Sequence, residues 1–244
     1  AWEHANFEVG GKLWFDILRK YYKNLKAIVC INSNSLQHYK SINKNSYLIP
    51  NLIGEPFESF DQNLIAQKEN TLIYVGRLDQ DKNVGEILDI INQVDLNDFQ
   101  LKIIGDGPSR NDLENKLNSN ENLKDKVQFL GSQSISDIYK ELTKSKIFLF
   151  TSKTECLPTV LIEANLMSNA LISYNCNYGP SDIVDESNGF LIPKSDQKQF
   201  IEKLQFLINQ PEELNTILRT SSRNSYKWRK KEILEQWDLI FNAK

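Results

Sequence analysis

The sequence predicts an α/β fold in which a parallel sheet is flanked by helices, and two observations support this prediction. From Thr71 onward, short β-rich runs alternate with segments of helical period, as in a sheet with crossover helices. Several of these runs are apolar throughout, which is typical of strands covered on both faces. The chain has 244 residues, 40% of them hydrophobic, and this is enough apolar material to bury such a sheet.

Six strands and five helices are expected in this part of the chain. The strands are residues 72–75, 101–104, 127–130, 147–151, 170–174 and 190–192, and the helices are residues 84–94, 109–117, 135–143, 159–167 and 197–208. Glycines follow the ends of the first three strands, at Gly76, Gly105, Gly107 and Gly131. Any one of them could serve only a tight turn. Together they favour a ligand site, because ligands bind at the carboxyl edge of an open parallel sheet.

Residues 1–50 are expected to be the end of a second, incomplete α/β domain. A helix near 13–24, a strand at 27–31, a helix near 35–39 and a strand-like run at 47–49 follow one another. One or two strands cannot form an independent sheet. We therefore divide the chain into a domain remnant (1–52), a linker (53–70), a main domain (71–224) and a terminal helix (225–244).

Composition excludes several classes of function. Three scattered cysteines and two histidines provide neither a C-x-x-C pair nor a zinc motif, so we expect reduced thiols and no metal site. The net charge of −3 does not favour nucleic-acid binding. No apolar run could span a bilayer and no signal-peptide pattern follows Ala1, so we expect a cytoplasmic chain.

The basic residues are concentrated near the amino terminus. Residues 1–50 carry seven Lys and Arg against three acids, a charge of +4. This segment would suit a phosphate-rich acceptor or an anionic membrane surface, and a solvated helix face explains it equally well. Five aromatic and apolar side chains among these cations would allow peripheral membrane contact, namely Trp14, Phe15, Leu18, Tyr21 and Tyr22. Packing within a domain explains them better.

Two carboxylates stand eight positions apart across a predicted strand–loop–helix junction, at Glu155 and Glu163. Pro158 and Thr159 suit the first turn of that helix, where backbone N–H groups and the positive end of the helix dipole attract an anion such as phosphate. Glu155 on the loop and Glu163 one turn into the helix would then face one pocket. Carboxylates beside a phosphate site are suited to accept hydrogen bonds from sugar hydroxyls.

A second motif follows the first strand of the main domain. Gly76 permits close approach of a ligand to the backbone, and Arg77 and Lys82 place two cations where a diphosphate could bridge them. An isolated pair would be ordinary surface charges, but the position at a strand end favours anion binding. The glycine turn at 105–107 lacks the third glycine of a dinucleotide fingerprint, and no ATPase phosphate loop is present.

Taken together, Arg77 with Lys82, the turn at 105–107, and Glu155 with Glu163 closely resemble the carboxyl-terminal, donor-binding domain of the family 4 retaining glycosyltransferases. The resemblance covers the chain from the first strand of the main domain to its end. It implies GT-B architecture, in which a nucleotide-sugar lies between two Rossmann-like domains. It also implies that the terminal helix crosses back to the amino-terminal remnant.

By motif position, the resemblance implies a role for each residue. Arg77 and Lys82 would bind the diphosphate, Glu163 the ribose hydroxyls, and Glu155 the donor sugar near the reacting carbon. His4 would face the donor from across the cleft, unless it is only an exposed terminal histidine. The remaining donor-binding residues, around the phosphates and the nucleobase, would be Gly76, Gly105, Gly107, Gly131, Ser132, Leu157, Pro158, Thr159 and Val160.

The segment 175–184 resembles members that build bacterial surface polymers such as teichoic acids, capsules and lipopolysaccharides. Two residues depart from the family pattern. Asp182 stands where glutamate is common, and Cys156 stands where glycine is common. We expect Cys156 to fill space rather than to narrow the pocket.

The implied function is transfer of a hexose, with retention and without a metal, from a nucleotide-diphosphate sugar to a glycan or lipid-linked acceptor. A UDP-sugar is the favoured donor, and no cofactor is expected. Two alternatives stay open: a silent nucleotide-sugar-binding module that needs a partner for the missing half, and a UDP-sugar epimerase. Most of an acceptor domain is lacking, so we do not expect a complete active site in this chain alone.

Overall fold

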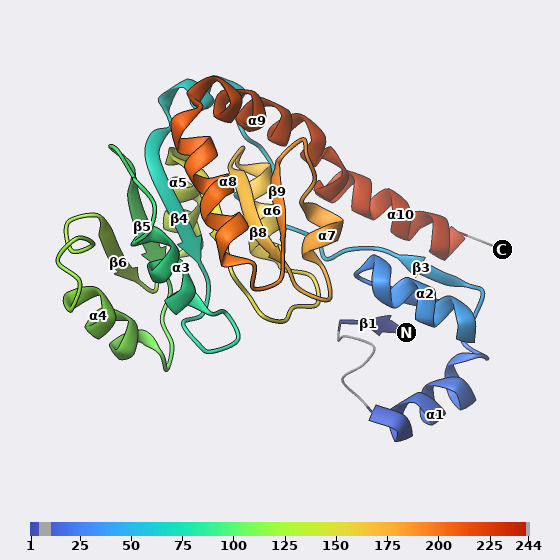
Figure 1. Cartoon of the computed structure of the whole chain (residues 1–244). Helices are drawn as coiled ribbons and strands as arrows, with labels where there is room; N and C mark the ends of the chain where they lie inside the picture. Colours follow the sequence, from blue (N-terminus) through green and yellow to red (C-terminus); the bar gives the residue numbers. More distant parts are fainter. Residues whose placement is uncertain (5–10, 243–244) are drawn as a thin grey trace.

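The computed structural model describes residues 1–4 and 11–242. It contains two parallel sheets, each with helices packed around it (Figure 1). The larger sheet belongs to the main domain and the smaller one to the amino-terminal part. A long terminal helix, α10 (Lys230–Asn242), extends from the first to the second (Figure 1).

The large sheet has six parallel strands in the order β6-β5-β4-β7-β8-β9. Their bounds are β4 (Glu69–Val75), β5 (Gln100–Ile104), β6 (Val127–Gly131), β7 (Ser145–Phe150), β8 (Ala170–Asn175) and β9 (Gly189–Pro193). From β4 the chain adds strands β5 and β6 toward one side of the sheet, and then β7, β8 and β9 toward the other side. The strand order therefore reverses between the neighbouring strands β4 and β7. In open α/β sheets, ligands bind outside the carboxyl ends of the strands at such a switch point. The topology therefore places a candidate site beyond the ends of β4 and β7.

Helices cover both faces of this sheet. One face carries α3 (Val84–Ile91), α4 (Arg110–Asn118), α8 (Gln197–Asn209) and α9 (Pro211–Asn224), and the other carries α5 (Ile135–Lys144), α6 (Thr159–Leu166) and α7 (Pro180–Ile183). Alternate side chains of β4 enter the two apolar cores: Leu72 and Tyr74 one, Ile73 and Val75 the other. Burial on both faces explains why the strand sequences are apolar throughout.

The observed architecture confirms the predicted fold class and the six predicted strands. The helix α9 was not predicted, because its sequence is rich in Ser, Thr, Arg and Asn. It begins at Pro211, a residue favoured in the first turn of a helix, and its small polar side chains pack inward. The Ser221 hydroxyl, for example, donates a hydrogen bond to Asn165 Oδ1 at 2.7 Å. The apolar side chains of Leu214, Ile217 and Leu218 enter the core beside these polar contacts, and both together bury one face of α9.

The small sheet has three parallel strands in the order β1-β2-β3. They are β1 (Trp2–Glu3), β2 (Ile28–Cys30) and β3 (Ser46–Leu48), accompanied by α1 (Gly11–Tyr22) and α2 (Ser33–Ile42). One or two strands were expected, and this expectation is corrected by β1, which is too short to show a sequence pattern. Within the expected linker 53–70, the structure has the 3-10 helix η2 (Gln62–Gln67) and the start of β4, where Glu69 pairs with Ser145.

The terminal segment 225–244 contains the short 3-10 helix η3 (Ser225–Trp228) followed by α10. Ile233 of α10 is fully buried against Val29 and Ile49 of the small sheet and its continuation, and Trp237 packs beside them. A second connection is polar: the backbone N–H of Ser33, the first residue of α2, donates to Asp182 Oδ2 at 2.8 Å. The two parts are therefore joined by an apolar contact and by hydrogen bonds.

None of the helices that the structure describes is both long and apolar enough to cross a membrane. Of the side chains for which packing was preferred to membrane contact, Tyr22 packs against the core of the small sheet and Tyr21 is exposed. The others, Trp14, Phe15 and Leu18, lie outside the described residues.

Replacing Ile233 with alanine should loosen the docking of α10, because it removes buried methyl groups and leaves a cavity. We expect the free energy of unfolding to fall by about 2–4 kcal/mol. Leu239→Ala is the matched control, since Leu239 lies on the same helix and is 75% exposed. Urea unfolding followed by tryptophan fluorescence measures both variants, and equal stabilities would contradict the docking of this helix.

Candidate functional site

A pocket of about 320 Å³ lies at the carboxyl ends of β4 and β7, where the strand order predicts a site. Three segments line this switch-point pocket: the end of β4 with the loop after it, the end of β7 with its loop, and the first turns of α6. The lining residues are Tyr74, Val75, Gly76, Arg77, Lys82, Phe150, Glu155, Leu157, Pro158, Thr159, Val160 and Glu163. The structure thus brings together both predicted cations, both predicted carboxylates and residues 157–160.

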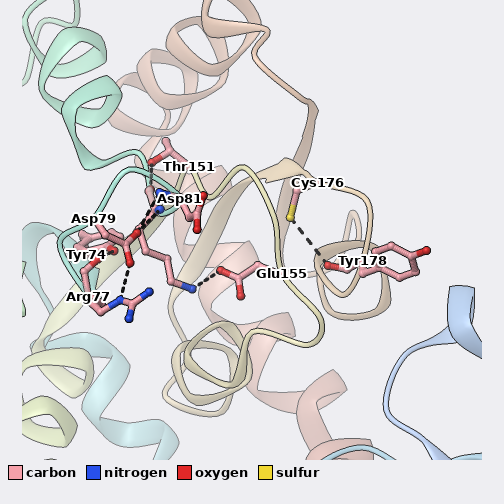
Figure 2. A network of polar contacts seen from close by, with 9 residues as sticks. Tyr74, Arg77, Asp79, Asp81, Thr151, Glu155, Cys176 and Tyr178 are labelled. Carbon is pink, nitrogen blue, oxygen red and sulfur yellow. Dashed lines mark hydrogen bonds and ion pairs between the residues drawn. The ribbon is translucent and has the colours of Figure 1, made fainter. Parts of the chain in front are cut away.

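An ion pair connects the two loops of the pocket. Lys82 Nζ lies 2.5 Å from Glu155 Oε1, and the Glu155 side chain is only 11% exposed (Figure 2). The Arg77 side chain, in contrast, is 70% exposed. One cation is therefore fixed inside the pocket by a carboxylate, while the other extends into solvent at its rim.

Asp79 organises the loop that carries both cations. Its carboxylate accepts hydrogen bonds from the Arg77 guanidinium, from the backbone N–H of Asp81 at 3.0 Å, and from that of Lys82 at 2.9 Å (Figure 2). Desolvation alone would raise the pKa of Asp79, but the Lys82 N–H and the Arg77 side chain lower it below its usual value. Asp79 is therefore ionised at neutral pH and holds the loop in shape.

The loops after β4 and β7 are also fastened through the backbone. The Thr151 hydroxyl donates to the carbonyl oxygens of Lys82 and Asn83 at 3.2 and 3.1 Å, and the Lys153 N–H donates to Asp81 O at 2.8 Å. These bonds fix the distance between the segment of Lys82 and the segment of Glu155. The pocket is thus preorganised rather than assembled from independent loops.

Glu163 points into the pocket from α6, and burial raises its pKa to about 7. Near neutral pH this carboxyl group is therefore present in both protonation states, and it can accept or donate a hydrogen bond to a hydroxyl group. The first turn of α6, which begins at Thr159, adds the positive end of the helix dipole. Two cations, a helix N-terminus and two carboxyl groups together suit a ligand that carries phosphate and hydroxyl groups.

Four of the predicted donor-binding residues do not line the pocket, namely Gly105, Gly107, Gly131 and Ser132. Gly105 has φ of +138°, and a Cβ atom there would lie 1.8 Å from Gly76 O. At Gly107, a Cβ atom would lie 2.4 Å from Leu78 O. Both glycines therefore let the loops after β4 and β5 pack closely, and a contact of these four residues with a ligand stays a prediction.

His4 follows β1, is exposed, and packs against the Trp2 ring with 4.3 Å between ring centroids. It does not line the switch-point pocket. The carboxyl edge of the small sheet nevertheless faces the loop after β7, because the Asn32 amide, just beyond β2, donates to Cys156 Sγ at 3.3 Å. His4 lies at the same edge, and its role across the cleft stays a prediction.

Two further kinds of group were considered for the site: the thiol of Cys156 and clusters of metal-binding side chains. Burial raises the pKa of the Cys156 thiol to about 11, so this thiol is protonated at neutral pH and is a poor nucleophile. Within residues 1–4 and 11–242, no cluster of three or more His, Cys, Asp or Glu side chains is arranged to hold a metal ion.

Sequence reasoning did not identify Tyr74, Phe150 and Asp79. Tyr74 and Phe150 belong to apolar strands, where nothing distinguishes a pocket wall from the core. Asp79 carries a weak signal, since an Asp three residues before Lys82 can accept a hydrogen bond from the Lys82 N–H. The Tyr74 hydroxyl also donates to Arg77 O at 3.0 Å, which adds to the support of this loop.

A model of the family described as Glycosyl transferases group 1 matches residues 56–225. The amylovoran biosynthesis glycosyltransferase AmsD of Erwinia amylovora is 30% identical over 204 residues, which cover 82% of this chain and 56% of AmsD. An α-1,4-N-acetyl-D-galactosaminyltransferase of Campylobacter jejuni is 29% identical over 242 residues, which cover 96% of this chain and 65% of that enzyme. Its name includes a saccharide linked to diNAcBac-PP-undecaprenol. The chain thus spans between about half and two thirds of these relatives.

Solved structures share the fold. HepE of Anabaena in complex with UDP superimposes with a TM-score of 0.84 at 15% identity, covering 99% of this chain and 71% of HepE. TarM of S. aureus, in complex with UDP and other ligands, gives a TM-score of 0.78 at 20% identity, covering 98% of this chain and 49% of TarM. At such low identity these similarities establish the fold alone.

The raised pKa of Glu163 predicts a pH-dependent effect of Glu163→Gln on stability. The pKa of Glu163 is about 7 in the folded state and about 4.5, the usual value, in the unfolded state. The unfolded chain therefore loses this proton more readily, and the native chain loses stability as the pH rises from about 4.5 to 7. The neutral glutamine avoids this cost. We therefore expect Glu163→Gln to melt about 3–6 °C above the native chain at pH 8, with the gain disappearing toward pH 5.

Differential scanning fluorimetry between pH 5 and 8.5 measures this effect, and Glu186→Gln, at an exposed position, is the control. A gain that does not depend on pH, or one shared by the control, would show that Glu163 has no raised pKa.

Proposed function

Because the chain belongs to the family of group 1 glycosyl transferases, we propose that it is the donor-binding part of an enzyme that transfers a hexose from a nucleotide-diphosphate sugar. This membership agrees with the resemblance drawn from the motifs. One observation carries the proposal: Arg77, Lys82, Glu155 and Glu163 converge on a single pocket at the switch point of the sheet. These side chains offer the charges that a sugar diphosphate ester requires.

Each part of the donor has a matching group in the switch-point pocket. Arg77 and Lys82, with the first turn of α6, bind the diphosphate, because cations and helix N-termini both attract phosphate oxygens. Glu163 accepts hydrogen bonds from the ribose hydroxyls. Glu155, already beside Lys82, accepts a hydroxyl of the donor sugar near the reacting carbon.

In the transfer step, the bond between the anomeric carbon and the diphosphate oxygen breaks, and the oxygen of the acceptor hydroxyl forms a new bond to that carbon. The proton of this hydroxyl passes to the leaving diphosphate. Negative charge then grows on the leaving diphosphate. Arg77 and Lys82 stabilise this charge, a contribution that increases toward the transition state. We propose transfer without a metal ion, since these two cations lie where the leaving group would be. We also propose retention of configuration, as the resemblance to the retaining glycosyltransferases implies.

The comparisons support a UDP-sugar as donor and a glycan or lipid-linked acceptor. HepE and TarM are described as complexes with UDP, and the Campylobacter jejuni relative is named for a saccharide on undecaprenol diphosphate. The family match favours neither the silent binding module nor the epimerase. The residues that contact the acceptor and the possible contact with a membrane surface stay predictions.

Calorimetric titration with UDP tests this function on the chain itself. Arg77→Gln should weaken UDP binding by about tenfold or more, because it removes a charge-assisted contact to phosphate. Arg229→Gln, at an exposed position on another part of the surface, should change the affinity less than about twofold.

Absence of UDP binding, or equal affinities of the two variants, would refute the assignment of the pocket. Transfer of radiolabelled sugar by the whole protein then separates an enzyme from a silent module.

A further inference from the structure

A second cavity, of about 600 Å³, lies at the amino ends of β4 and β7. Lys68 and Lys146 mark this position, since Lys68 directly precedes β4 and Lys146 is the second residue of β7. The other walls come from η2 and α9, which pack against each other. This basic cavity shares no lining residue with the switch-point pocket and lies at the opposite edge of the sheet.

Positive charge is concentrated around the basic cavity. Lys68, Lys146, Arg219 and Arg223 line it, and no Asp or Glu is among its described lining residues. Within the described part of the chain, none of these four side chains forms an ion pair with a carboxylate. The whole chain has a net charge of −3, so a basic composition does not explain the cluster.

The ammonium group of Lys68 is fixed beside the cavity. Lys68 is 6% exposed, and its Nζ donates to the carbonyl oxygens of Leu142, Thr143 and Ser145 at 3.1, 3.0 and 2.7 Å. Burial lowers its pKa to about 7, as expected where no negative charge lies nearby. A buried cation without a counter-charge is costly, and an anion in the cavity would offset this cost.

The helix α9 contributes two further cations from one face. Arg219 and Arg223 are four positions apart and both are exposed, so their like charges repel along the helix. An anion bound between the two guanidinium groups would attract both of them and offset their mutual repulsion. Asn215, one turn earlier, and Gln62 and Asn63 of η2 add amide groups that can bond to hydroxyls.

We propose that the basic cavity binds a phosphate-bearing small molecule, with Lys146, Arg219 and Arg223 holding phosphate oxygens and the amides holding hydroxyl groups. Lys68, whose three N–H donors are engaged by backbone carbonyls, adds positive charge beside them. Phosphate suits four cations better than a single carboxylate, because it offers more acceptor oxygens and up to two negative charges. The volume lies within the range of small-molecule sites, so the ligand is larger than phosphate itself. A free phosphate ester and the headgroup of an anionic phospholipid both present this chemistry.

The test uses a chain that carries Arg77→Gln and Lys82→Gln, so that the switch-point pocket does not compete for the probe. Inorganic pyrophosphate is the probe, and calorimetry measures its binding. Adding Arg219→Gln with Arg223→Gln should weaken binding at least tenfold. The matched control adds Lys44→Gln with Arg229→Gln, which removes the same charge from exposed positions elsewhere and should change binding less than twofold.

A second arm measures co-sedimentation of the same proteins with phosphatidylglycerol vesicles. Loss of pyrophosphate binding in the Arg219 and Arg223 variant indicates a free phosphate ester, and loss of vesicle binding alone indicates a lipid headgroup. Either result supports the proposal. Equal behaviour of the two double variants in both arms, or no binding in either arm, overturns it. Circular dichroism verifies folding, and Lys146→Gln provides a second variant of the cavity.

Discussion

The ion pair between Lys82 and Glu155 is the contact on which the organisation of the switch-point pocket depends. It joins the loop after β4 to the loop after β7, at the point where the strand order reverses. Opposite charges in a largely buried position are stable only when their partners are fixed, and here the fixing groups are Asp79 and Thr151. The hydrogen bonds of Asp79 and Thr151 to the backbone of Lys82 therefore hold one member of the ion pair in position inside the pocket.

The fold explains why such a pair can form. Parallel strands bring the carboxyl ends of β4 and β7 side by side, although the loops that follow them are far apart in the sequence. Alternating side chains of the strands are buried on both faces of the sheet, so only the ends of the strands, where the loops begin, are open to ligands. The carboxyl ends of β4 and β7 border the mixed charges of the switch-point pocket, and their amino ends border the basic cavity, whose described lining contains four cations and no Asp or Glu. The same two strands thus border two sites of different electrostatic character.

The sequence predicted features that depend on local pattern. Apolar runs and helical periods were sufficient for the six strands of the large sheet, and the spacing of Glu155 and Glu163 indicated a common pocket. Features that depend on contacts could not be predicted. The hydrogen bond of the buried Ser221 hydroxyl fastens α9 to α6, and the basic cavity joins Lys68 to arginines far along the chain. Gly105 is an example: its position after a strand suggested a ligand, while its close approach to the backbone of Gly76 gives a packing reason for the glycine.

The most direct measurement for the central assignment is a crystal structure of this chain with UDP. We expect the diphosphate to lie within hydrogen-bond distance of Arg77 and Lys82, with the ribose hydroxyls bound to Glu163. Electron density for the nucleotide at another place, with no contact to these three side chains, would contradict the assignment of the switch-point pocket to the donor.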